Sequence, residues 1–158
     1  MSLIQRPYQL LSDLVVHEVD PSVGYARKVV NVTVAADTNL KLGSVVYRAK
    51  GTDPDATYSV LTANTALVAT NEFAVVIGDY YSYRLDPVVV TAATSPKNIT
   101  VYQRGLVMLK DFTVLAAVKA NFAGITDAEF KTLRHLLEEQ GVLIESAGTV
   151  VRPVGVGA

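Results

Sequence analysis

The residues that could do chemistry are few, and their spacing does not bring them together. His17 and His135 lie in different parts of the chain and lack the one-turn separation of paired histidine ligands. Asp53 and Asp55 are close together in "TDPDAT", but a calcium loop needs a longer alternating series of oxygen ligands, and Asp with Pro favours a turn. We therefore expect no catalytic residues, no bound metal and no cofactor, so that the protein is not an enzyme.

The most unusual polar segment is "GDYYSYRLD". Tyrosine and arginine are enriched at the centres of protein–protein interfaces, and they can also stack on nucleic-acid bases. The neighbouring Asp79 and Asp86 and the net charge of −1 disfavour nucleic acid, which requires a basic surface. A subunit interface and an exposed strand edge carrying tyrosines remain as interpretations, and both concern Tyr80, Tyr81, Tyr83 and Arg84.

The composition indicates one globular domain. Half of the 158 residues are hydrophobic and 18% are charged, so the chain can bury a core. There is no cysteine, which excludes disulfides and thiolate chemistry. The apolar stretches fall short of the roughly 20 residues that a bilayer requires, and the first residues lack the pattern of a secretion signal. We expect no contact with a membrane.

From Lys28 onward, hydrophobic residues alternate with the period of a β-strand. In "KVVNVTVAA", Val30, Val32 and Val34 fall on one side. Segments rich in Asp, Asn, Gly and Pro, which favour turns, separate further strand-like runs: "GSVVYRA", "TYSVLT", "EFAVVIGDYY", "PVVVTAA", "NITVYQRGLVML", "VLIE" and "TVVR". The pattern predicts a mainly β domain over residues 28–158, a compact small barrel or sandwich with one helix.

That helix is predicted at about residues 126–140. Thr126 and Glu129 have the spacing of a capping box, in which each side chain accepts a hydrogen bond from the other residue's backbone amide. Gly141 follows, where glycine can end a helix in the left-handed conformation. The stripe expected to pack on the sheet consists of Phe130, Leu133, Leu136 and Leu137.

Residues 1–27 form a distinct opening section, interrupted by Pro7, Asp20-Pro21 and Gly24. Its apolar residues are too scattered to predict a strand, although residues 9–16 are compatible with a short amphipathic helix. Two interpretations stay open. The section either packs on the protein's own core or forms an N-terminal arm that becomes ordered on a partner.

The order of several features resembles a known family. These are the turn Gly43–Val46 that leads into a strand, an apolar strand ending at Ile77-Gly78, the Arg104-Gly105 step, and the late helix followed by Gly141–Ile144. Together they resemble the lambda-type head decoration (capsid cement) proteins of tailed bacteriophages, over roughly residues 32–151. The resemblance implies a compact β-rich fold without catalytic activity.

The resemblance also implies a location and a partner. Such proteins bind the outer capsid surface of the expanded head in the virion, commonly as homotrimers, and clamp neighbouring subunits of the major capsid protein together; they are made in the host bacterial cytoplasm. The capsid-binding arm would fall in residues 1–27 and comprise Leu3, Ile4, Arg6, Tyr8, Leu10, Leu11, Leu14 and Val16. This section is more apolar than the family's arm, which leaves open whether it is already folded before binding.

Two other functions agree with the same residues. The protein could be another virion structural part, such as a tail or baseplate component, which would assemble into rings or stacks. It could also be a glycan-binding β module, with Tyr80 and Tyr81 as the platform for the sugar.

Overall fold

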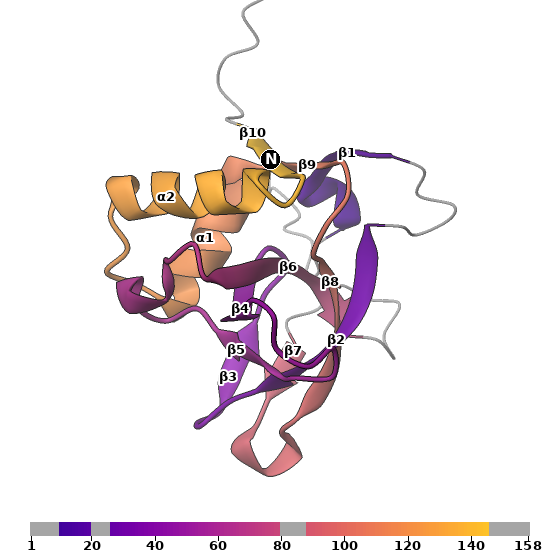
Figure 1. Ribbon diagram of the computed structural model, residues 1–158, viewed down its shortest axis with the longest axis vertical. Helices are drawn as coiled ribbons and strands as arrows, with labels where there is room; N and C mark the ends of the chain where they lie inside the picture. Colours follow the sequence, from indigo (N-terminus) through magenta and orange to yellow (C-terminus); the bar gives the residue numbers. More distant parts are fainter. Residues whose placement is uncertain (1–9, 20–25, 80–87, 146–158) are drawn as a thin grey trace, which may run out of the picture.

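A computed structural model of the protein describes residues 10–19, 26–79 and 88–145. These residues form a mainly β fold with two α-helices (Figure 1). The strands are β1 Val15–Glu18, β2 Arg27–Thr33, β3 Thr38–Leu40, β4 Val45–Ala49, β5 Tyr58–Val60, β6 Asn71–Asp79, β7 Val88–Val90, β8 Lys97–Tyr102, β9 Val107–Lys110 and β10 Val142–Glu145. The helices are α1 Asp111–Asn121 and α2 Asp127–Glu138, with short 3-10 turns at Leu11–Asp13, Asn64–Ala66 and Ala92–Thr94.

A small closed barrel forms the centre of the fold. Its strands follow the order β2-β5-β4-β6-β8, and β8 pairs with β2 to close it. All neighbouring pairs are antiparallel except β2 with β5, which run parallel. The mainly β prediction, including a small barrel, is thereby confirmed.

The long strand β6 contributes to two hydrophobic cores. Ala74 and Val76 point into the barrel, where they join residues such as Val32 and Ile99. Phe73, Val75 and Ile77 of β6 point outward and belong to a second core. Because successive side chains alternate between the faces of a strand, one strand can serve both cores.

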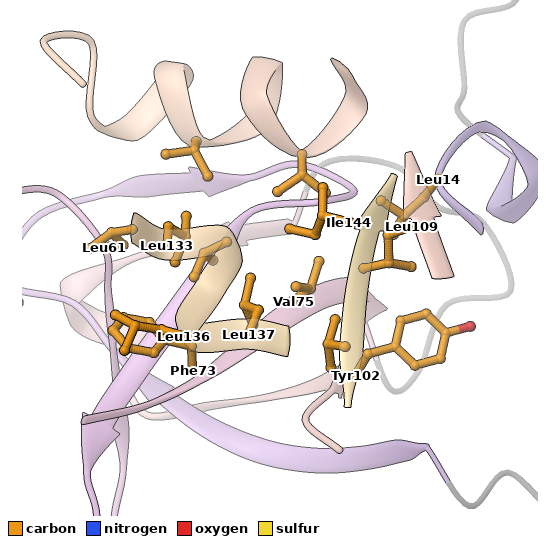
Figure 2. Packing of buried hydrophobic residues seen from close by; sticks show 14 of the residues in the cluster. Leu14, Leu61, Phe73, Val75, Tyr102, Leu109, Leu133, Leu136, Leu137 and Ile144 are labelled. Carbon is orange, nitrogen blue, oxygen red and sulfur yellow. The ribbon is translucent and has the colours of Figure 1, made fainter. Parts of the chain in front are cut away.

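The second core lies between the barrel and an outer layer made of α1, α2 and a three-stranded sheet. That sheet has the order β1-β9-β10, with β1 antiparallel and β10 parallel to β9. Figure 2 shows side chains of β6, α2 and β10 meeting in this core, among them Val75, Leu137 and Ile144. This packing buries one part of the outer face of the barrel.

Helix α2 has the predicted form. Thr126 Oγ1 accepts from the Glu129 amide at 3.2 Å, and Glu129 Oε2 accepts from the Thr126 amide at 2.8 Å, so the capping box is present. The predicted stripe is buried: Phe130, Leu133, Leu136 and Leu137. Gly141 follows with a φ of +87°, as expected for a glycine that ends a helix.

Four local predictions were wrong. Strand β1 lies in the opening section, where no strand was expected. Helix α1 occupies "DFTVLAAVKAN", where no helix was expected. The run predicted as one strand over "NITVYQRGLVML" is two strands, β8 and β9, which separate around Gly105 with a φ of +91°. Strand β3 lies within "AADTNLKLG", which was assigned to a turn, and it pairs with β7. The predicted strand "TVVR" falls outside the described residues.

Candidate functional site

Half of the predicted arm residues fall outside the described part of the chain, namely Leu3, Ile4, Arg6 and Tyr8. Of the others, Leu14 is fully buried in the second core, and Leu11 packs against it. Leu10 and Val16 are exposed. Two interpretations were left open for the opening section. For residues 11–18 the structure shows the first of them, packing on the protein's own core. Tyr80, Tyr81, Tyr83 and Arg84 also lie outside the described residues.

Strand β1 provides an accessible sheet edge. One side of β1 pairs with β9, and within the described ranges no strand lies on its other side. The pairing is irregular at Val16, because Val15 faces Leu109 and His17 faces the next residue, Met108. Such a β-bulge turns a side chain out of the regular ladder.

Three exposed apolar side chains accompany this edge: Val16, Val19 and Leu106. The Val19 amide donates to the Leu106 carbonyl at 3.0 Å, so the last two are direct neighbours. We call these three residues, with the outer backbone edge of β1, the β1 edge surface. Figure 1 shows β1, β9 and β10 together at the top of the molecule.

The opposite edge of the same sheet is covered. Helix α2 packs against β10. Arg134 Nη2 donates to the Ile144 carbonyl at 2.7 Å, so this backbone oxygen is already bonded. Within the three-stranded sheet, β1 is therefore the edge that can still accept a partner.

A half-buried ion pair connects β1 to the barrel. Arg27 on β2 donates to Glu18 on β1 through Nε at 3.0 Å and Nη2 at 2.8 Å. Tyr102 on β8 donates its hydroxyl to Glu18 Oε2 at 2.7 Å. The Glu18 side chain is only 5% exposed, whereas that of Arg27 is 36% exposed. A bidentate arginine–carboxylate pair is strong and geometrically specific, so it holds the edge strand in one position.

The ionisation of this cluster follows from its surroundings. Burial alone would raise the pKa of Glu18, but the hydrogen bonds from Arg27 and Tyr102 outweigh it and lower that pKa below the ordinary 4.5. Burial, together with the hydrogen bond to Glu18, raises the pKa of Tyr102. At neutral pH, Glu18 is thus a carboxylate and Tyr102 a neutral donor.

A second polar network links strands β4, β5 and β6 of the barrel. Arg48 pairs with Glu72, and the Arg48 guanidinium lies 4.8 Å from the centre of the Tyr58 ring. Tyr58 donates to Glu72 Oε1 at 3.0 Å, and Gln103 Nε2 donates to the Tyr58 hydroxyl at 2.8 Å. Arg48 Nη1 also reaches the carbonyls of the loop at residues 53–56. Because these polar groups use their hydrogen-bonding capacity on one another, we assign the network a role in stabilising the fold.

The residues first considered for chemistry are not assembled into a reactive centre. Asp53 and Asp55 form the predicted turn, in which the Asp55 amide donates to Asp53 Oδ1 at 2.9 Å. His135 lies on the surface of α2, 3.6 Å from the carboxylate of Glu139. No group of three or more His, Cys, Asp or Glu side chains that could hold a metal occurs in the described ranges.

Sequence reasoning missed the Glu18–Arg27–Tyr102 cluster. Its members lie on three strands. Glu18 and Arg27 belong to the opening section, for which no strand was predicted, and Tyr102 belongs to a run that was read only as a strand. The available signal was Glu18 itself, a carboxylate at the end of an apolar run, with Arg27 at the start of the next strand.

Comparisons with known proteins leave the family open. No family model, no curated protein and no solved structure matches this chain. None of the described helices is long and apolar enough to span a bilayer.

Proposed function

We propose that this protein is a non-enzymatic decoration protein. It binds the outer surface of an expanded phage head and bridges neighbouring subunits of the major capsid protein. The sequence resemblance suggests this role, and the observation that carries it is the β1 edge surface. That surface combines an open backbone edge with exposed apolar side chains at one end of the β domain.

An open edge suits a capsid partner that offers an extended segment. In β-augmentation, main-chain hydrogen bonds provide affinity and exposed side chains select the partner. Here Val16, Val19 and Leu106 would supply the apolar contacts.

A cement protein must also resist deformation. The Glu18–Arg27–Tyr102 cluster ties the edge strand to the barrel, so that a load on β1 passes into the closed sheet. Residues 1–9, which include Leu3, Ile4, Arg6 and Tyr8, would extend the contact as the arm. Assembly as homotrimers would multiply a modest interface through avidity.

Co-sedimentation with phage heads tests this function. Expanded heads and unexpanded procapsids of the phage that encodes the protein are incubated with it in parallel. We expect saturable binding to expanded heads alone. Removing residues 1–9, which leaves every described element in place, should weaken that binding. The truncation must stop before Leu10, because Leu14 is part of the core.

A matched pair of substitutions tests the β1 edge surface. Val16 is 51% exposed, and Val89 on β7, in the lower half of Figure 1, is 50% exposed. Val16→Glu should weaken binding by about tenfold or more, as expected for a central interface residue, while Val89→Glu should leave it unchanged. If the protein bound neither expanded heads nor procapsids, the proposed decoration function would be refuted. If the two substitutions weakened binding equally, the β1 edge surface would not be the capsid-binding surface.

A further inference from the structure

A second surface lies on the outer side of the barrel, away from the β1 edge surface. It is a groove of about 610 Å³ bounded by β2, β4, β5 and the turn that leads into β3. In Figure 1 this turn lies toward the lower end of the molecule, whereas β1, β9 and β10 lie at the top. We call it the Tyr47 groove.

Strand register places three polar side chains of the groove in one row. Ser59 on β5 faces Thr33 on β2 and Tyr47 on β4 in the two adjoining ladders. Neighbouring strands are about 4.8 Å apart, so the row extends about 10 Å across the barrel. This length fits a short oligomer better than a single small metabolite.

The walls of the groove are rich in hydroxyl groups. Five hydroxyl-bearing residues line it: Thr33, Thr38, Tyr47, Ser59 and Thr62. Each hydroxyl can both donate and accept a hydrogen bond. The hydroxyls of Tyr47, Ser59 and Thr62 have no bonding partner among the described residues, so they are available to a ligand.

The Tyr47 ring is held in place by packing. It contacts Phe73 on β6 with ring centres 6.3 Å apart and a tilt of 36°. Tyr47 is partly exposed and lines the groove. A fixed aromatic ring offers an apolar surface with a polar tip.

Charged ligands do not suit this groove. Its lining contains no Lys, Arg, His, Asp or Glu. The nearby carboxylate of Asp37 accepts a hydrogen bond from the Ala92 amide at 3.3 Å. A phosphate would find no cation, and a metal ion no carboxylate. An aliphatic ligand would leave the hydroxyls without partners.

We propose that the Tyr47 groove binds a neutral oligosaccharide. The apolar face of one sugar ring stacks on Tyr47, and the hydroxyls of Ser59 and Thr62 exchange hydrogen bonds with those of the sugar. This function is separate from capsid binding. With the β1 edge surface against a capsid, the Tyr47 groove would face outward, toward the glycans of a cell surface.

Saturation-transfer NMR and isothermal titration calorimetry test the proposal with three neutral probes: maltohexaose, cellohexaose and N-acetylated chitohexaose. We expect weak, saturable binding of at least one. Tyr47→Leu should weaken it by about tenfold through loss of stacking. Ser59→Glu, at an exposed strand position, should do the same by placing a charge in the groove. Thr132→Glu adds the same charge on the exposed face of α2 and serves as the control.

The binding measurements have one result that supports the proposal and two that contradict it. Binding that both groove variants weaken and the control does not would support the proposal. Failure of all three probes to bind, or binding that Ser59→Glu leaves unchanged, would overturn it. Thermal unfolding of each variant confirms that it is folded, and Ser59→Glu alone decides the result if Tyr47→Leu is unstable.

Discussion

Replacing Glu18 by glutamine probes how the edge strand is attached. The glutamine has nearly the same shape, but it lacks the charge that accepts from Arg27 at 2.8 Å and from Tyr102 at 2.7 Å. A hydrogen bond to a charged group is worth about 1.5–3 kcal/mol. Arg27 is partly exposed and can regain water, so the losses do not simply add. We expect the free energy of unfolding at neutral pH to fall by about 2 kcal/mol.

The pH dependence distinguishes the lost charge from a general packing defect. The native pKa of Glu18 lies below its ordinary 4.5, so the native protein binds fewer protons at this group than the unfolded chain does. Its stabilising contribution is therefore complete above about pH 4.5 and disappears as the pH falls through the lowered native pKa. The difference in unfolding free energy between wild type and Glu18→Gln should shrink over that range.

Urea unfolding at pH 7 and again at pH 3.5 provides the measurement, with Glu145→Gln as an exposed control that should change stability by less than about 0.5 kcal/mol. For a domain of this size, 1 kcal/mol corresponds to about 2–4 °C in Tm, so the variant should unfold about 4–8 °C lower at neutral pH. An equal loss at both pH values, or none at pH 7, would refute the role assigned to the ion pair.

Backbone geometry supports two further predictions, each measured by urea unfolding. Alanine should be tolerated at Gly124 and should cost about 1 kcal/mol of unfolding free energy at Gly51, which has a φ of +74° and free space around it. It should cost clearly more at Gly141, where a Cβ would lie 2.8 Å from the Gly105 carbonyl oxygen. Equal losses at Gly51 and Gly141 would show that this close approach carries no penalty. Thr126→Ala should lower stability by about 1 kcal/mol through loss of the α2 cap, and an unchanged midpoint would contradict that role.

Helix α2 shows how much local sequence can determine. Its cap, its buried stripe and its end at Gly141 are all set by residues within one or two turns of one another, so their spacing alone predicts them. The alternating valines of β2 predict a strand with one buried face for the same reason.

Helix α1 shows where local sequence is insufficient. It has no side-chain cap at its start, and its valines and threonine favour strands. The helix is stabilised by burial of Val114 and Val118 in the second core. It can approach the barrel because Gly43 has no Cβ, which would lie 3.2 Å from the Thr113 carbonyl oxygen.

The candidate surfaces depend on partners that lie far apart in the chain. Sequence identified strand-like runs, but barrel closure depends on pairing β2 with both β5 and β8, and such long-range pairing leaves no local pattern. Glu18 meets Tyr102, and Thr33 comes into line with Tyr47, only after the barrel has closed. The sequence by itself determined the mainly β class and helix α2, because their signals are periodic and local. The tertiary structure decided the anchored edge strand and the Tyr47 groove, because both are made by strand register.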